Sequence, residues 1–218
     1  RLFESLGTTV DKLQGNPRLA VLNADDASFG YLQSKTRTRW VSYGIENEAD
    51  VQARRVMYHA GGMRFEVMGK DWGVALESSL VGRFNISNIL AAVTAAVVGL
   101  EIEMEAVKNG VKNLAGIPGR MERINLGQDF SAIVDFAHTP NALKNAIETA
   151  RQMTEGRVIT VFGSAGLRDR QKRRMMAEIS VKIADMTVLT AEDPRSESLA
   201  DILAEMAVGA ENVGGVEG

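Results

Sequence analysis

Three short polar segments carry most of the side chains in this sequence that could do chemistry. They are Asp135-Phe-Ala-His138, Gly163 to Arg174, and Ala191-Glu-Asp-Pro-Arg195. Each lies at the end of an apolar run of the strand type, and the carboxyl ends of parallel strands meet at one edge of a sheet. Carboxylates, a histidine and arginines at such an edge are suited to binding charged ligands. The sequence therefore predicts a ligand site built from these loops.

The second of these segments has the highest density of positive charge. Cations at a helix start oppose the helix dipole, by a few tenths to about 1 kcal/mol each when exposed. The pattern therefore favours an anion that binds at the helix N-terminus and is held by these cations, with a solvated basic patch as the alternative. The five cations in seven positions are Arg168, Arg170, Lys172, Arg173 and Arg174.

Asp135 and His138 each allow two interpretations. Asp135 ends a buried strand, so its carboxylate could cap the turn before Thr139 or bind a ribose hydroxyl or a metal. His138 could form a local hydrogen bond in the loop or contact a ligand. In the third segment, Glu192 and Asp193 could be ordinary loop acids before Pro194.

Two further candidates lie earlier in the chain. Asn85 and Asn88 are three residues apart at the start of an apolar helix, so they share one face. They could bind a purine edge or a phosphate, or Asn85 or Ser87 could cap the helix. Arg120 lies in a Gly/Pro-rich break and could be a linker charge or reach a ligand held between two domains.

Alternating patterns predict the elements that position these residues. In the first part we expect strands at 19–23, 40–43, 63–68 and 72–77, the last two as a hairpin, and helices at 84–100 and 103–114. In the second part we expect strands at 131–136, 157–162 and 186–190 and helices from Thr139, Arg170 and Ser196. Strand–helix alternation predicts a parallel sheet. The Gly116-Ile-Pro-Gly119 break divides the chain into domains at 1–117 and 118–218.

Composition excludes several classes of protein. Hydrophobic residues make up 45% and charged residues 24%, the balance of a globular protein rather than a disordered one. The absence of cysteine excludes disulfide scaffolds and thiolate sites, and two histidines are too few for a multi-histidine metal site. A net charge of -3 disfavours broad nucleic-acid binding, and no apolar run reaches the roughly 18 to 20 residues of a membrane span. We therefore expect a cytoplasmic protein without nucleic-acid or membrane partners.

Six segments in a fixed order resemble the Mur ligase family, most closely the branch of UDP-N-acetylmuramoyl-tripeptide synthetases. They are Leu22-Asn-Ala-Asp-Asp26, Gly82 to Ala91, Pro118-Gly-Arg-Met-Glu122, Val134 to Pro140, Phe162 to Arg173, and Thr190-Ala-Glu-Asp-Pro-Arg195. The resemblance implies an α/β protein: the second half of a P-loop-type central ATP-binding domain with a mixed sheet, then a Rossmann-like C-terminal domain with a parallel sheet, incomplete at its end.

The resemblance also implies a reaction, namely ATP-dependent amide-bond formation in peptidoglycan synthesis, and thus in cell-wall biogenesis, cell shape and cell division. A peptide carboxylate on a UDP-sugar attacks the ATP γ-phosphate and becomes an acyl phosphate, which the amine of an incoming amino acid then attacks. The substrates would be UDP-N-acetylmuramoyl-dipeptide, ATP with Mg²⁺, and meso-diaminopimelate or another amino acid, handled by a monomer. Alternatives are a folylpolyglutamate or cyanophycin synthetase type of ligase, or a non-catalytic binding paralogue.

By position in the matching motifs, the resemblance assigns roles to individual residues. Arg120 and Asp135 would be catalytic, and both would contact ATP together with Asn85, Asn88 and His138. The incoming amino acid would be bound by Arg168, Asp193 and Arg195.

Some positions depart from the family pattern. Asp193 replaces the family's asparagine in Asp-Asn-Pro-Arg, and a carboxylate would repel an acidic substrate. Ser164, Ala165 and Leu167 stand where the family usually has Cys, Gly and Asp.

Other family features are missing from these residues. The 218 residues contain no Gly-x-x-Gly-Lys-[Ser/Thr] phosphate loop and, by resemblance, no metal ligands; these would lie mostly upstream of Arg1. We therefore expect a piece of a longer ligase that is inactive alone.

Overall fold

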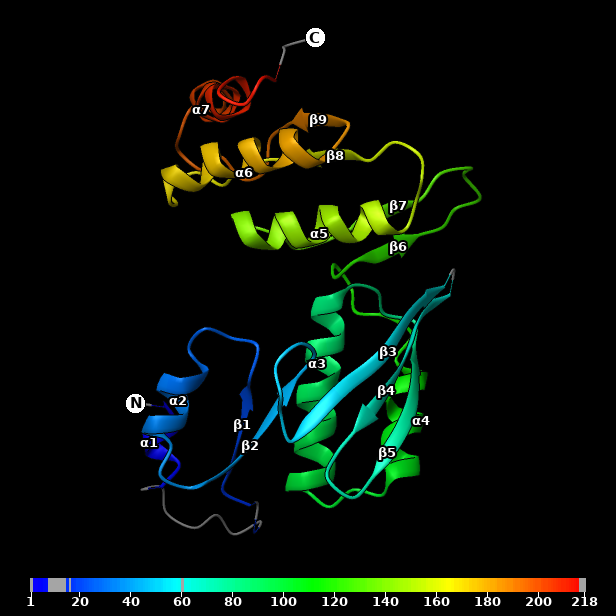
Figure 1. Cartoon of the computed structure of the whole chain (residues 1–218). Coiled ribbons are helices and arrows are strands. Elements are labelled where there is room, and N and C mark those ends of the chain that lie inside the picture. The colour runs from blue at the N-terminus through cyan, green and yellow to red at the C-terminus, as the bar shows by residue number, and fades with distance from the viewer. Residues whose placement is uncertain (1, 8–14, 16, 60, 216–218) are drawn as a thin grey trace. The chain divides into compact units, whose positions relative to one another are not determined.

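The computed structural model describes residues 2–7, 15, 17–59 and 61–215 of the 218-residue chain (Figure 1). The chain divides into two compact units, Arg1–Ile117 and Pro118–Gly218. Each unit combines strands with helices, which confirms the predicted α/β class. Among the described residues, no helix combines the length and apolarity needed to cross a bilayer.

The first unit is built around a mixed five-stranded sheet in the order β1-β2-β3-β4-β5. The β1, β2 and β3 strands run parallel, and β4 and β5 add antiparallel neighbours, so the mixed sheet expected from the sequence is confirmed. The elements are α1 (Leu2–Ser5), β1 (Leu19–Asn23), α2 (Phe29–Lys35), β2 (Arg39–Gly44), β3 (Val51–His59), β4 (Gly62–Met68), β5 (Gly73–Ser78), α3 (Arg83–Thr94), a π-helical turn η1 (Ala95–Gly99) and α4 (Met104–Asn113).

The α3 helix packs its buried face against this sheet, in a core that includes Phe65, Leu76, Ile86 and Leu90. We expected a helix to residue 100 that is buried on nearly every side. Instead α3 buries one face, and its last turn widens into η1, where Leu100 N–H bonds to Ala95 O at 3.0 Å. Apolar composition alone therefore overstated the burial of this segment.

The β3 strand was not predicted. Its apolar alternation is interrupted by Arg54 and Arg55, and the pairing with β4 shifts register between Arg54 and Met57. Arg55 has a left-handed backbone with φ 52°. A bulge of this kind breaks the two-residue period from which a strand is inferred.

The second unit has a two-stranded parallel sheet, β8-β9, and a separate antiparallel pair, β6-β7. We expected β7 in one parallel sheet with β8 and β9. It pairs instead with β6, a short strand after the Gly/Pro break that the strand–helix pattern did not reveal. The elements are β6 (Glu122–Ile124), β7 (Ala132–Val134), α5 (Pro140–Gln152), β8 (Ile159–Phe162), α6 (Arg170–Ile183), β9 (Met186–Leu189) and α7 (Leu199–Glu211).

Helix starts in the second unit follow capping rules. Thr139 caps α5 by accepting a hydrogen bond from Ala142 N–H, with Pro140 at the first helical position, as predicted. Ser198 rather than Ser196 caps α7, accepting from Asp201 N–H, so the expected start at Ser196 was wrong. The intervening Glu197 is used elsewhere, as described below.

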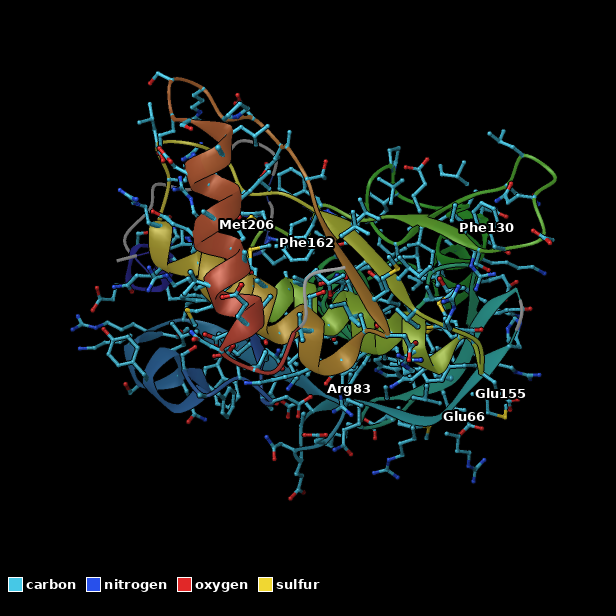
Figure 2. All side chains as sticks on the ribbon, turned by 90° about the horizontal axis from the view of Figure 1, so that it is seen from above. Glu66, Arg83, Phe130, Glu155, Phe162 and Met206 are labelled. Atoms are coloured by element: carbon cyan, nitrogen blue, oxygen red, sulfur yellow. The ribbon has the colours of Figure 1, made fainter. Side chains whose placement is uncertain are left out.

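Two small cores stabilise the second unit. One joins α5, β8 and α6 through residues such as Leu143, Ile147 and Met176, and the other joins α6 to α7. Phe162 and Met206, labelled in Figure 2, both belong to the second core. Both cores include Phe162, the last residue of β8, so the loop that follows β8 starts from a fixed point.

Candidate functional site

Two loops at the carboxyl ends of β8 and β9 are joined by backbone contacts. We call Gly163–Asp169 the glycine loop and Ala191–Glu197 the acid loop. Gly166 N–H donates to Asp193 O at 2.8 Å, next to the strand bond from Thr190 N–H to Phe162 O at 3.0 Å. A Cβ on Gly166 would lie 2.0 Å from Pro194 O, so only glycine permits this approach. The two loops therefore form one surface, as the parallel-strand argument predicted for them. The third loop of that prediction, Asp135–His138, follows β7, which belongs to a different sheet.

Two side chains of these loops sit on left-handed backbone. Leu167 has φ 53° and Arg195 has φ 52°. Residues with a Cβ rarely adopt this conformation unless surrounding contacts impose it, at a cost of roughly 1 kcal/mol or more. The contacts of the two loops thus hold Leu167 and Arg195 in a backbone conformation, and hence a side-chain orientation, that these residues would not adopt by their intrinsic preference.

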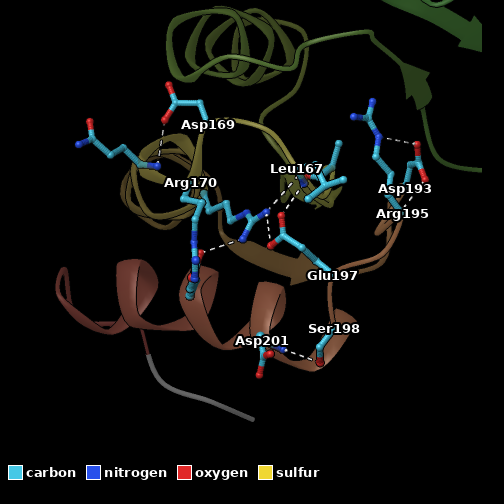
Figure 3. Close-up of polar contacts among 12 residues, drawn as sticks. Leu167, Asp169, Arg170, Asp193, Arg195, Glu197, Ser198 and Asp201 are labelled. Atoms are coloured by element: carbon cyan, nitrogen blue, oxygen red, sulfur yellow. Dashed lines mark hydrogen bonds and ion pairs between the residues drawn. The ribbon is translucent and has the colours of Figure 1, made fainter.

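A network of four charges lies behind the loops, and we call it the Arg173 network: Arg170, Arg173, Glu197 and Glu205. Arg173 is 1% exposed, and its guanidinium pairs with Glu197 Oε2 and Glu205 Oε2, both at 2.9 Å. Arg170 also pairs with Glu205. Glu197 Oε1 accepts from Leu167 N–H, as Figure 3 shows. The network has two positive and two negative charges, and Arg173 is its buried centre.

This network corrects the interpretation of the five cations. Arg170 and Arg173 are neutralised by carboxylates of the chain itself, so they are not part of an anion site at the start of α6. The N-cap of α6 is Asp169, whose carboxylate accepts from Gln171 N–H. A carboxylate already occupies that helix N-terminus, where the anion was expected.

Arg168, Asp193 and Arg195 lie on the joined loops. Arg168 is exposed, and no hydrogen bond or ion pair engages it among the residues that the structure describes. Asp193 and Arg195 pair with each other, as Figure 3 shows. Their Oδ2 and Nε atoms are 3.4 Å apart. The Asp193 carboxylate, which replaces the family's asparagine, therefore lies beside the Arg195 guanidinium of the same loop. This pairing reduces the repulsion that Asp193 alone would exert on an acidic ligand.

Arg120, Asp135 and His138 come together around β7. Both Asp135 oxygens accept backbone hydrogen bonds at 2.8 Å, from Met121 N–H and from Ala137 N–H. Asp135 thus ties the segment before β6 to the turn after β7. The bond from Ala137 N–H is the turn-capping role that was one of its two interpretations, while Thr139 itself caps α5. The Arg120 guanidinium lies 4.7 Å from the centre of the Phe136 ring.

The third member of this cluster is His138. Its Nδ1 lies 3.2 Å from Phe136 O, the local hydrogen bond that was one of its two interpretations. Its ring also meets the Phe136 ring edge-on, with 4.9 Å between the centroids. Phe136 is 59% exposed, so the cluster presents an aromatic and cationic surface to solvent.

Asn85 and Asn88 lie on the first turns of α3, in the first unit. Asn85 is buried and donates from Nδ2 to Val81 O at 2.8 Å, while its Oδ1 lies 3.4 Å from Nδ2 of the exposed Asn88. Gly82, with φ 92°, is the N-cap, so neither Asn85 nor Ser87 caps the helix. The buried amide of Asn85 therefore orients Asn88.

No described group of three or more His, Asp or Glu side chains could hold a metal ion. Asp25, one of the two acids in the Leu22 to Asp26 motif, has a structural role. Asp25 accepts hydrogen bonds from the N–H groups of Ile45, Glu46 and Asn47. Partial burial opposes ionisation of Asp25, but these bonds outweigh it and lower its pKa.

Glu197 should make the second unit sensitive to acid. The hydrogen bond from Leu167 N–H, followed by that from Arg173, holds the Glu197 pKa below its ordinary value of 4.5. Because the folded pKa is lowered, the stabilisation is complete above about pH 4.5 and disappears as pH falls through the folded pKa. Glu197→Gln should lower the melting temperature at pH 7 and flatten its decline between about pH 5 and 3. Thermal denaturation across that range checks this, and an unchanged slope would contradict it.

Sequence reasoning missed Arg173, Glu197 and Glu205 as a unit, although a signal was present. Arg173 is in helical phase with Met176, Ala177 and Ser180, and all of them are buried. Counting the cations as one group ignored this phase. Phe136 was also missed as a contact of Arg120.

Comparison with known proteins supports a family assignment. Residues 8–96 match the Mur ligase middle domain, and residues 119–217 match the Mur ligase glutamate ligase domain. The chain is 40% identical over 210 residues to UDP-N-acetylmuramoyl-L-alanyl-D-glutamate–2,6-diaminopimelate ligase of Bacillus velezensis, covering 96% of this chain and 42% of that protein. The chain thus spans about two fifths of the length of the curated relatives it matches.

Solved structures show the same arrangement of elements. A UDP-N-acetylmuramoyl-L-alanyl-D-glutamate–2,6-diaminopimelate ligase matches with a TM-score of 0.57 and 32% identity, over 90% of this chain and 41% of that one. MurF from Acinetobacter baumannii matches with a TM-score of 0.74 over 92% of this chain and 42% of that one. At 18% identity this second match speaks for the fold alone.

Proposed function

Because the chain belongs to the Mur ligase family, we propose that it is part of an ATP-dependent ligase that adds an amino acid to UDP-N-acetylmuramoyl-dipeptide in peptidoglycan synthesis. Residues 1–117 would be the second half of the central ATP-binding domain and residues 118–218 most of the C-terminal domain. The reaction would activate the peptide carboxylate as an acyl phosphate, which the amine of the amino acid then attacks. The relative from Bacillus velezensis carries diaminopimelate in its name, and we propose that amino acid as the substrate.

The observation that carries this proposal is the joined pair of loops. Arg168 stands exposed on the glycine loop, and the Asp193–Arg195 pair stands on the acid loop, which Gly166 N–H binds directly. An arginine binds a carboxylate through two parallel N–H bonds, whereas Asp193 can accept from an ammonium group. Diaminopimelate carries an ammonium and a carboxylate at each end, so it complements both an arginine and an acid–base pair. Lysine lacks the distal carboxylate, so it would offer Arg195 no carboxylate to bind.

The residues around β7 suit the nucleotide. Each Asp135 oxygen accepts one N–H bond and keeps a second lone pair, so the held carboxylate can still accept from a ribose hydroxyl. Arg120 adds positive charge and N–H donors beside the exposed Phe136 ring, which the His138 ring meets edge-on. We propose that these residues of the second unit contact ATP. As a separate proposal for the first unit, Asn88, oriented by Asn85, contacts the nucleotide. When bound, Mg²⁺ would neutralise phosphate charge; its ligands would come mostly from residues that precede this sequence in the full-length ligase.

An incorporation assay on the full-length ligase that contains this sequence tests the function. We expect ADP release and a labelled product from ATP, UDP-N-acetylmuramoyl-dipeptide and diaminopimelate, with lysine and glutamate at least tenfold less efficient. The 218-residue chain alone is the control and should give no product. Ligation of glutamate to folate in place of the muramoyl substrate would overturn the assignment, as would the absence of ligation with every amino acid.

A further inference from the structure

Arg173 is a charged residue in the interior of the second unit. Its side chain is 1% exposed and shares the buried face of α6 with Met176 and Ala177. Burying a guanidinium is costly unless carboxylates pair with it, and Glu197 and Glu205 do so. A hydrophobic residue in the same place would fill the core without this cost. The arginine therefore provides something other than packing.

The contacts of Arg173 come from three separate segments. Nη1 donates to Glu205 Oε2 on α7 at 2.9 Å. Nη2 pairs with Glu197 Oε2 at the end of the acid loop at 2.9 Å and donates to Ala165 O in the glycine loop at 3.3 Å. Because the guanidinium is planar and rigid, these contacts fix both loops and α7 in a single relative arrangement.

Glu197 extends the same connection toward the substrate residues. Its other oxygen, Oε1, accepts from Leu167 N–H, and Leu167 directly precedes Arg168. On the other side, Glu197 lies two residues after Arg195. The Leu167 and Arg195 backbones are the left-handed ones, which need external contacts to persist. The Arg173 network supplies such contacts beside both residues.

We propose that Arg173 is a positioning residue: through Glu197 and Ala165 it fixes the glycine and acid loops so that Arg168 and Arg195 are held ready for the incoming amino acid. At 1% exposure it does not touch the substrate itself. The inference rests on the proposed function and adds to it a residue that orients the binding loops without contacting the substrate.

Two variants of the full-length ligase separate positioning from stability. Arg173→Met should raise the KM for the amino acid at least tenfold, leave the KM for ATP within twofold, and lower the melting temperature. Adding Glu205→Met replaces the Arg173–Glu205 pair with an apolar pair, so the melting temperature should recover in part. Recovery is partial because Glu197 and Arg170 each still lack one partner. The KM for the amino acid should stay raised at least tenfold in the double variant, because the contacts from Arg173 to Glu197 and Ala165 O are still missing. A KM that returns to the wild-type value together with stability would overturn the proposal.

Arg151 offers a matched control. It also pairs with an acid, Asp185, at 2.7 Å and donates to Ile183 O at 3.0 Å, but these contacts lie before β9, at the strand ends opposite the two loops. Arg151→Met should lower the melting temperature and leave the amino-acid KM within twofold. An equal rise in that KM for Arg151→Met would overturn the proposal, since any destabilisation would then suffice.

Limited trypsin digestion of the 218-residue chain gives a readout that does not depend on activity. Arg173→Met should speed cleavage after Arg195 at least fivefold under native conditions, whereas Arg151→Met should not. Unchanged cleavage would overturn the role of Arg173 whether or not the ligase is active. Faster cleavage of the Arg173→Met chain would support the role of Arg173 in holding the two loops. If the full-length protein then ligated no amino acid, the proposed function alone would be refuted.

Discussion

Arg168→Ala in the full-length ligase is expected to raise the KM for the incoming amino acid about 10- to 150-fold, which corresponds to about 1.5–3 kcal/mol for a lost charge-assisted hydrogen bond. The reason is that Arg168 is exposed on the joined loops, and no contact within the described residues engages its charge. Removing it should therefore cost ligand binding and little stability. Steady-state kinetics with each substrate varied in turn would measure the effect, and the KM for ATP should stay within about twofold.

Arg174→Ala is the matched control for this experiment. Arg174 is exposed and has the same charge, but it lies on α6 beyond the glycine loop. Its removal should leave the KM for the amino acid within about twofold of the wild-type value. If both variants raise this KM equally, the effect reflects general charge attraction, and Arg168 does not bind the amino acid directly.

Gly166→Ala is expected to destabilise the second unit by about 3 kcal/mol, at the upper end of the cost of overpacking. The new Cβ would lie 2.0 Å from Pro194 O and 2.7 Å from Pro194 C. Because both obstacles are backbone atoms, the glycine and acid loops would have to separate. A fall of more than about 10 °C in the melting temperature of this unit is expected, measured by calorimetry on the 218-residue chain.

Gly110→Ala is the corresponding control for an added methyl group. Gly110 lies inside α4 with nothing within 4 Å of its ideal Cβ position. Alanine favours a helix interior by about 0.5–1 kcal/mol over glycine, so the first unit should become slightly more stable. A Gly166→Ala protein as stable as the wild type would show that the two loops are not in the close contact described.

Local rules predicted much of the fold from the sequence. Thr139 and Pro140 marked the start of α5 because capping depends only on neighbouring residues. The β4–β5 hairpin followed from two alternating runs around Gly69-Lys-Asp71. The loops after β8 and β9 came together because parallel strands end at the same edge.

Long-range pairing limited the remaining predictions. The antiparallel partner of β7 is a strand of only three residues, Glu122–Ile124, which carries no periodic signal of its own. The acid that pairs with Arg173 from α7, Glu205, is 32 residues away in the sequence. Only the fold shows that two of the five cations are already neutralised, since charge counting treats every arginine as equally available to a ligand.

The left-handed backbones at Leu167 and Arg195 have a consequence for engineering. The left-handed conformation costs each of these residues roughly 1 kcal/mol or more. The supporting helices therefore impose the conformation of Arg195, and the seven-residue segment 191–197 would not adopt it alone. A synthetic peptide of residues 191–197, or the same letters grafted onto a foreign scaffold, would relax to ordinary extended backbone. Transplanting this substrate selectivity would require moving α6 and α7 as well.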